Sequence, residues 1–146
     1  MIVETGDLPS LAGRVTMVSG GFDPLHPGHI AYFHAAWELG APVLCNVSSD
    51  EWLAHKHPPL LTQAERIAVV DAIRFVAYTH AERTTTEDVL AQLRPRYFVK
   101  GADWRERLPE EEQAVCAEHS IDVVFLDTVV DSSTEVLRRY HARSGG

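Results

Sequence analysis

Residues 15–30 read VTMVSGGFDPLHPGHI, and this stretch decides how the rest of the chain is interpreted. The apolar residues of 15–18 predict a short buried strand, which Gly20 and Gly21 end. Two consecutive glycines let the backbone approach a ligand closely, because no Cβ stands in the way. Pro27 suits the first position of a helix, where its missing N–H is not needed, and the residues that follow are typical of a helix. The stretch therefore predicts a strand, a glycine turn and a helix N-terminus.

Two histidines, His26 and His29, stand at the start of this helix. The free N–H groups and the positive dipole end of a helix N-terminus attract anions, and phosphate is the commonest. A spacing of three residues can place both imidazoles on one side of the first turn, where they can hold an oxyanion as charge develops on it. Asp23 lies nearby in the sequence and can orient a histidine or help to hold a metal. An ordinary loop and a zinc site are alternatives, although a third zinc ligand at a suitable spacing is not visible.

The run GGFDPLHPGH, residues 20–29, resembles the G-x-F-D-x-x-H-x-G-H signature of cytidylyltransferase-type nucleotidyltransferases. Its resemblance is strongest to the nucleotidyltransferase domain of ADP-heptose synthase, with glycerol-3-phosphate cytidylyltransferase second. The resemblance implies that His26 and His29 contact the nucleotide phosphates and stabilise the transition state. It also implies that the nucleotide lies against the other motif residues, namely Gly20, Gly21, Phe22, Asp23 and Gly28.

Length and composition indicate one globular domain spanning residues 1–146, with 45% hydrophobic and 23% charged residues. The formal net charge of −8 argues against binding to nucleic acid, which depends on clustered basic residues. No apolar run is long enough to span a membrane and no secretory leader is visible, so we expect a cytoplasmic protein. Cys45 and Cys116 fall in a predicted strand and helix, and we expect both to be buried, reduced thiols.

The rest of the chain alternates short apolar strands with helical segments. We expect an irregular segment at 1–13, a polar loop at 49–59 and a frayed tail at 144–146. Strands are expected near 15–18, 42–48, 75–78, 97–100 and 123–126. Helices are expected at 28–39, from Thr62, at 87–93 with Thr86 as its cap, at 108–119 and at 132–143. Thr62 and Glu65 form a capping-box pattern. This alternation predicts a single Rossmann-like α/β domain with a five-stranded, mainly parallel sheet and helices on both faces.

Two basic residues outside the histidine motif are candidates for phosphate or substrate contacts. Lys56 follows the second strand, and the resemblance implies that it contacts substrate and nucleotide phosphates as a catalytic cation; a solvated loop lysine is the alternative. Arg66 belongs to a helix that resembles the E-x-R helix of the family, which implies substrate binding. An ion pair with Glu65 or Asp71 at the surface explains Arg66 equally well.

Two further motifs lie at the ends of later strands. Lys100, Gly101 and Asp103 belong to a run that resembles the K-G-x-D-[YW] loop of the heptose enzymes, which implies that they lie beside the nucleotide and that Asp103 binds ribose or a metal; an ordinary turn, with Trp104 packing against it, is the alternative. A hydroxyl run can cap the last helix and resembles the I-S-T-T run that grips nucleotide phosphates: Ser132, Ser133 and Thr134. Asp127 stands where the glycerol-phosphate enzymes carry an arginine, which favours the heptose-type branch.

The implied reaction joins an NMP from ATP or CTP to a phosphorylated small molecule, with a sugar phosphate favoured, and releases pyrophosphate. Positioning and charge stabilisation carry such a reaction, because a phosphate oxygen is already a competent nucleophile. We expect Mg²⁺ to arrive with the nucleotide, and the sequence leaves its protein ligands open; by analogy, we expect a homodimer. The alternatives are a non-catalytic nucleotide-binding module, a cytidylyltransferase acting on a polyol phosphate or phosphonate, and, more weakly supported, a zinc-dependent hydrolase.

Overall fold

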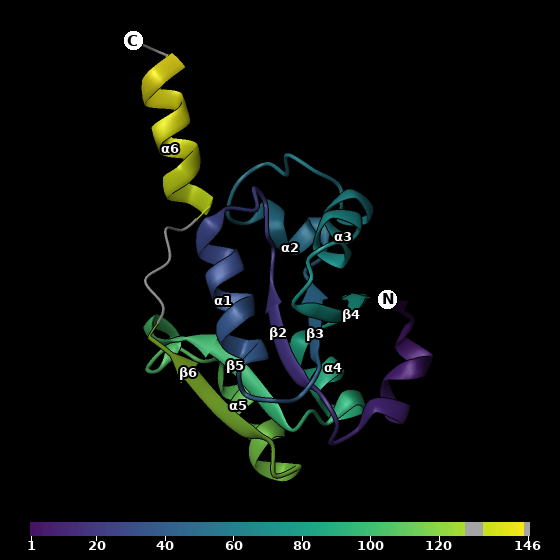
Figure 1. Cartoon of the computed structure of the whole chain (residues 1–146). Helices are drawn as coiled ribbons and strands as arrows, with labels where there is room; N and C mark the ends of the chain where they lie inside the picture. The colour runs from purple at the N-terminus through teal and green to yellow at the C-terminus, as the bar shows by residue number, and fades with distance from the viewer. Residues whose placement is uncertain (128–132, 145–146) are drawn as a thin grey trace.

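The computed structural model describes residues 1–127 and 133–144, except for the side chains of Ser133 and Thr134 (Figure 1). Within these residues a parallel sheet of six strands has the order β1-β4-β3-β2-β5-β6. The strands are β1 (Ile2–Val3), β2 (Thr16–Gly20), β3 (Val43–Val47), β4 (Val76–Ala81), β5 (Tyr97–Gly101) and β6 (Asp122–Leu126). The α/β class and the parallel sheet predicted from the sequence are confirmed.

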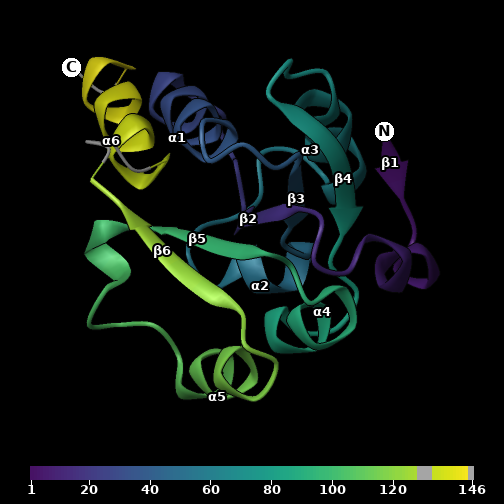
Figure 2. The ribbon, with the colours of Figure 1, turned by 60° about the horizontal axis from the view of Figure 1, so that its bottom comes forward.

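Helices connect the strands and cover both faces of the sheet (Figure 2). They are α1 (Pro27–Trp37), α2 (Asp50–Ala54), α3 (Gln63–Asp71), α4 (Thr86–Leu93), α5 (Glu110–Glu118) and α6 (Ser133–Ser144), together with the 3-10 segments η1 (Thr5–Leu11) and η2 (Ala102–Trp104). One apolar core joins α1 and α3 to the sheet, and a second core joins η1, α4 and α5 to its other face. None of the described helices is long and apolar enough to cross a membrane.

The central strand β3 shows why the sheet could be recognised from the sequence. All five of its residues are buried, since cores lie on both sides of it. A strand covered on both faces reads as a nearly continuous apolar run, and residues 42–48 have this pattern. Cys45 within it and Cys116 in α5 are free, buried thiols, as predicted. Burial raises the pKa of Cys116 to about 11.

The N-terminal segment is more regular than predicted. Residues 2–3 form β1, which pairs in parallel with Thr79 and His80 of β4, and η1 follows it. The prediction of an irregular segment at 1–13 and of five strands is therefore wrong for these elements. A strand of two residues carries no periodicity that a sequence pattern can reveal. Leu8 of η1 is fully buried and ties the segment to the second core.

Three boundaries also differ from the predictions. Residues 50–54 of the expected polar loop form α2, where the Ser49 side chain accepts a hydrogen bond from the Trp52 N–H. Thr85, and not Thr86, caps α4, because the Thr85 hydroxyl accepts from the Asp88 N–H. Ser144, expected to be frayed, ends α6, while residues 145–146 lie outside the described residues. The Thr62–Glu65 capping box is confirmed.

The order of the strands defines where a ligand can bind. From β2 the chain continues to β3 and β4 on one side, and then returns to place β5 on the other side of β2. Ligands of open α/β sheets bind outside the carboxyl ends of the strands, at such a reversal. The carboxyl ends of β2 and β5 carry Gly20, Gly21, Lys100 and Gly101. The topology therefore brings the glycine turn after β2 and the K-G-x-D-[YW] run after β5 to the same crevice.

Candidate active site

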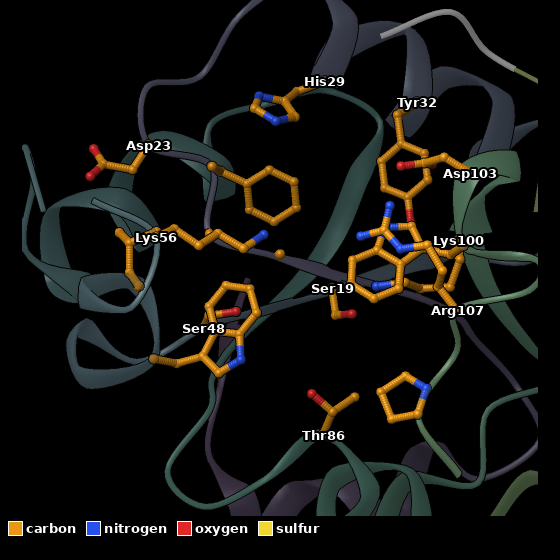
Figure 3. Close-up of a pocket in the computed structure, with 18 of the residues that line it drawn as sticks. Ser19, Asp23, His29, Tyr32, Ser48, Lys56, Thr86, Lys100, Asp103 and Arg107 are labelled. Carbon is orange, nitrogen blue, oxygen red and sulfur yellow. The ribbon is translucent and has the colours of Figure 1, made fainter. Parts of the chain in front are cut away.

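A cavity of about 860 Å³ opens at the carboxyl ends of β2, β3 and β5 (Figure 3). Its size lies at the upper end of the range of about 300–1,000 Å³ that is usual for ligand pockets. Nine residues predicted for the site line it: Gly20, Gly21, Phe22, Asp23, His29, Lys56, Lys100, Gly101 and Asp103. The sequence analysis did not propose several of its other lining residues, which include Ser19, Tyr32, Ser48, Trp52, Thr86, Arg107 and Glu112.

The turn after β2 is shaped by the Phe22 ring. Phe22 has a φ of 53°, a left-handed conformation that bulky residues rarely adopt. Its ring packs edge-on against His29, with centroids 5.0 Å apart, and against Phe33 of α1 at 5.1 Å. A Cβ on Gly20 would lie 3.0 Å from the tip of this ring. The absence of a Cβ on Gly20 therefore leaves room for the Phe22 ring, which packs against His29.

His26 and His29 form a reciprocal cap at the start of α1. His29 Nδ1 accepts from the His26 N–H at 3.3 Å, and His26 Nδ1 accepts from the Gly28 N–H at 3.1 Å. The two rings stack with centroids 3.8 Å apart, so they lie on the same side of the turn, as their spacing predicts. Because both Nδ1 atoms accept hydrogen bonds, the neutral rings carry their protons on Nε2. His29 lines the cavity, whereas His26 is buried and stacks on it.

The environment keeps His29 uncharged. Burial, and then the neighbouring His26, lower the pKa of His29 from 6.5 to about 3. His29 is therefore a neutral imidazole at physiological pH, with Nε2–H available as a donor. A donor fixed in place before reaction can stabilise negative charge without the cost of reorganising.

Asp23 joins the glycine turn to the loop after α2. Its carboxylate accepts hydrogen bonds from the N–H of Leu60 at 2.7 Å and of Leu61 at 3.2 Å. Asp23 is almost completely buried. The carboxylate thereby fixes the loop that follows Lys56 against the histidine motif.

Both lysines of the chain, Lys56 and Lys100, line the cavity. The Lys56 ammonium lies 4.5 Å from the centre of the Trp52 ring, and that of Lys100 lies 4.2 Å from the Trp104 ring. Burial lowers the pKa of both lysines; Arg107 lowers that of Lys56 further, while Glu112 opposes the shift at Lys100. Two ammonium groups and the Arg107 guanidinium that line one cavity form a site for a polyanion such as a triphosphate.

The turn after β5 holds Asp103 against Gly101. A Cβ on Gly101 would lie 2.7 Å from Asp103 Oδ1. Trp104, for which packing against the turn was expected, lines the cavity, where Lys100 and Arg107 lie over its ring. Arg107 was missed because it lies beyond the K-G-x-D-[YW] run, and only the short 3-10 turn η2 brings it back to the site.

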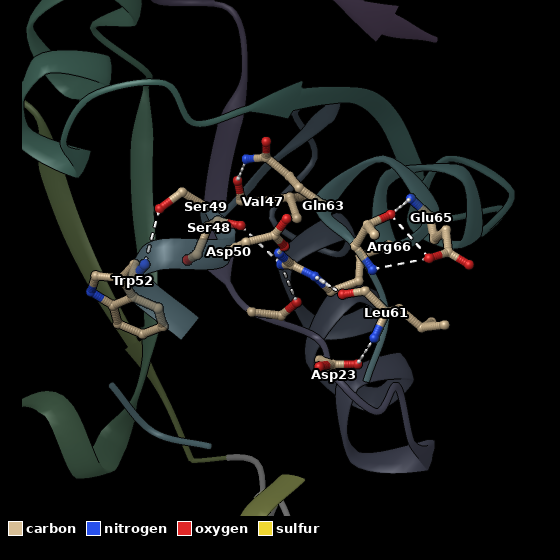
Figure 4. A network of polar contacts seen from close by, with 12 residues as sticks. Asp23, Val47, Ser48, Ser49, Asp50, Trp52, Leu61, Gln63, Glu65 and Arg66 are labelled. Carbon is tan, nitrogen blue, oxygen red and sulfur yellow. Dashed lines mark hydrogen bonds and ion pairs between the residues drawn. The ribbon is translucent and has the colours of Figure 1, made fainter. Parts of the chain in front are cut away.

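Arg66 does not line the cavity. Its guanidinium lies within a network of polar contacts (Figure 4). Its Nη1 donates to the carbonyls of Gly21 and Ser48 at 3.0 and 2.9 Å, and its Nε donates to that of Leu61 at 3.2 Å. Its Nη2 pairs with Asp50. The side chain thus holds three segments around the cavity together. This position matches neither of the two interpretations made from the sequence, which were a substrate contact and a surface ion pair with Glu65 or Asp71.

The remaining predicted residues have other places. Gly28 lies in the first turn of α1 outside the cavity lining, and its N–H is bonded to His26. Ser132 lies outside the described residues, as do the side chains of Ser133 and Thr134. The described residues contain no cluster of three or more His, Cys, Asp or Glu side chains suited to a metal ion.

The sequence of this chain is similar to that of a known family and of several named proteins. The family model described as cytidylyltransferase-like matches residues 17–139. A D-beta-D-heptose 1-phosphate adenylyltransferase of Bordetella bronchiseptica is 33% identical over 114 residues, which cover 74% of this chain and 68% of that protein. An FAD synthase of Methanoregula boonei is 39% identical over 64 residues, covering 44% of this chain and 43% of the synthase. The chain thus spans less than half the length of that synthase.

Comparison by structure supports the fold. A crystal structure of a lipopolysaccharide core biosynthesis protein from Thermoplasma volcanium superposes with a TM-score of 0.67 at 21% sequence identity. The match covers 81% of this chain and 98% of that one. At this identity the similarity establishes the shared architecture.

Proposed function

The chain belongs to the cytidylyltransferase-like family, and from this premise we propose that it is a nucleotidyltransferase. It joins an NMP from a nucleoside triphosphate to a phosphorylated small molecule and releases pyrophosphate. The observation that carries the proposal is the common cavity of His29, Lys56 and Lys100 at the reversal of the strand order. A neutral donor and two cations around one space suit a triphosphate whose α-phosphorus is attacked.

The residues around the cavity suggest how the reaction proceeds. An oxygen of the acceptor phosphate attacks the α-phosphorus in line, and the bond to the leaving pyrophosphate breaks. His29 donates from Nε2–H to a non-bridging oxygen as charge develops, while His26 holds its ring by stacking and through its backbone N–H. Lys56 and Lys100 neutralise the phosphates, which brings the two anionic reactants together.

Magnesium belongs to the proposal as part of the nucleotide substrate. Mg²⁺ is usually held by phosphate oxygens together with one or two carboxylates, rather than by a cage of protein ligands. Asp103 and Asp127 both line the cavity and are carboxylates of this kind. Loss of activity with EDTA and its recovery with excess Mg²⁺ test this part.

The comparisons favour one choice of substrates. The similarity to a heptose 1-phosphate adenylyltransferase supports ATP as donor and a sugar phosphate as acceptor. Asp127, where the glycerol-phosphate enzymes carry an arginine, supports the same choice. We also propose a cytoplasmic homodimer by analogy with the family; light scattering of the purified chain tests the dimer.

Pyrophosphate release is the experiment that tests the function. The wild-type chain is incubated with each of the four common NTPs and a panel of acceptors: hexose and heptose 1-phosphates, glycerol 3-phosphate and FMN. We expect release with one nucleotide and one acceptor class, and a loss of about 10²–10³-fold in His29→Ala. NTP binding without release from any pair would favour the non-catalytic nucleotide-binding module instead.

A further inference from the structure

A buried chain of hydrogen bonds ends at the cavity wall. Glu82, which is 4% exposed, accepts at Oε1 from Asn46 Nδ2 and from the Thr86 hydroxyl, each at 2.8 Å. Asn46 Oδ1 lies 2.8 Å from His80 Nδ1, and His80 Nε2 lies 2.9 Å from the Thr5 hydroxyl. Of these residues, Thr86 alone lines the cavity.

The network fixes the direction in which Thr86 can bond. A threonine hydroxyl has one proton to donate and two lone pairs to accept with. Thr86 gives that proton to Glu82, whose other partner, the Asn46 amide, also donates to it. Toward the cavity Thr86 therefore presents lone pairs only. It can accept a hydrogen bond from a ligand, but it cannot donate one.

Glu112 supplies a second acceptor on the same side of the sheet. It belongs to α5, which packs beside α4, and its side chain lines the cavity. Burial raises the pKa of Glu112, and the positive charge of Lys100, which lines the same cavity, opposes this shift. An ionised carboxylate is an acceptor only. The two helices α4 and α5 thus each contribute an acceptor to one wall.

This acceptor wall, Thr86 and Glu112, lies away from the histidine motif. In Figure 3, Thr86 and His29 lie at opposite ends of the cavity, with Lys56 on one side and Lys100 and Arg107 on the other. A ligand whose phosphate is held by these cations can therefore reach Thr86 with its far end. The groups it places there must carry hydrogens that they can donate.

We propose that Thr86 and Glu112 determine acceptor specificity by accepting hydrogen bonds from the hydroxyls of a phosphorylated sugar. The proposal rests on the nucleotidyltransferase function, which supplies the phosphorylated acceptor, and adds the part of the molecule that is recognised. Ribose hydroxyls of the nucleotide have the same chemistry, so the test has one arm for each source.

The test compares two phosphates of the same ring size by quenching of tryptophan fluorescence. Mannose 1-phosphate carries ring hydroxyls, and cyclohexyl phosphate carries none. We expect the wild type to bind the sugar phosphate at least tenfold more tightly. Thr86→Val and Glu112→Gln should each reduce this preference by about three- to tenfold, whereas ATP affinity should stay unchanged in Thr86→Val.

Matched variants separate recognition from folding. Thr86→Ser keeps the hydroxyl and should retain the preference, whereas Thr84→Val and Glu111→Gln change exposed neighbours that do not line the cavity. Thermal unfolding checks each variant, and Glu112→Gln carries the test if Thr86→Val does not fold.

Three results overturn the proposal: no wild-type preference for mannose 1-phosphate, a preference that survives both substitutions, or a loss confined to ATP, which would assign the wall to the ribose. Because the readout is binding, it is independent of catalysis. Failure to release pyrophosphate would reject the proposed function and leave the measured preference standing, while release of pyrophosphate with an unchanged preference would reject only the acceptor wall.

Discussion

Arg66 Nη2 lies 2.7 Å from Asp50 Oδ1, and this ion pair fastens the middle of α3 to the start of α2. The Arg66 side chain is fully buried, while that of Asp50 is 45% exposed. A buried guanidinium is tolerated only when its donors are used, and here carbonyls of the glycine turn, of the end of β3 and of the 56–61 loop accept from it. Arg66 therefore determines where the walls of the cavity stand without touching the cavity itself.

Replacing Arg66 should cost mainly stability. In Arg66→Met the buried Ser48 carbonyl and the partly buried Gly21 and Leu61 carbonyls lose a donor. A buried acceptor left unpaired costs about 1–3 kcal/mol, so we expect a decrease of about 3 kcal/mol in the free energy of unfolding. Urea denaturation measures it. Arg74→Met is the control, because Arg74 is exposed just after α3; the change there should stay within about 0.5 kcal/mol. If Arg66→Met instead keeps nearly wild-type stability and raises the KM for the acceptor strongly, Arg66 contacts the substrate, as the sequence predicted.

Arg66 also illustrates what a sequence can reveal about a site. The strand-glycine-helix unit, the parallel sheet and nine of the lining residues were predictable, because each depends on local patterns and on strand order alone. The direction of a long side chain depends on tertiary contacts, here with carbonyls 18 and 45 residues away. Arg107, Thr86 and Glu112 were missed for the same reason: each reaches the site from an element that carries no local motif.

The acid sensitivity of the fold should depend on His29. Its pKa is about 3 in the folded chain against 6.5 for an ordinary histidine. Between these values the unfolded chain binds a proton that the folded chain does not, so stability falls as the pH drops below about 6.5. Allowing for solvent at the cavity mouth, we expect His29 to account for about 2 kcal/mol of the loss between pH 7 and pH 4.

Urea unfolding at both pH values measures this contribution. His29→Asn should lose less stability on acidification than the wild type. The pH–activity profile of the wild type should show no change near pH 6.5 that is due to His29. His141→Asn, an exposed histidine on α6, should leave the slope unchanged. Identical slopes in the wild type and His29→Asn would mean that His29 is protonated as easily in the folded chain as in the unfolded one.

Nucleotide binding should weaken at a lower pH than it would if the site lysines had the ordinary lysine pKa. Burial lowers the pKa of Lys100 from 10.5, and the pKa of Lys56 is shifted in the same direction. Phosphate affinity depends on the protonated form, so it is lost as the pH rises through these lowered values. We expect ATP affinity to fall about tenfold or more across this transition, because this is the usual contribution of one charge-assisted hydrogen bond to binding.

Arginine substitutions identify the titrating groups. Arginine stays charged throughout this range, so Lys100→Arg should flatten part of the alkaline loss, and the double variant Lys56→Arg/Lys100→Arg should flatten most of it. The measurement is the ATP dissociation constant between pH 7 and 10.5, followed by tryptophan fluorescence. An alkaline limb that persists unchanged in the double variant would assign the loss to another group.

Gly101 and Asp103 should act as one unit in nucleotide binding. Gly101 has an ordinary φ of −66°, so alanine meets no backbone penalty there. Its Cβ would, however, lie 2.7 Å from Asp103 Oδ1, and the carboxylate would have to swing away.

If Asp103 holds the nucleotide, Gly101→Ala and Asp103→Ala should raise the ATP dissociation constant by a similar factor, about tenfold, and the double variant should be no worse than either. Gly6→Ala, with no atom within 4 Å of the added carbon, should behave as the wild type. Additive effects would instead mean that Gly101 contacts the nucleotide through its own backbone, which a Cβ would obstruct directly.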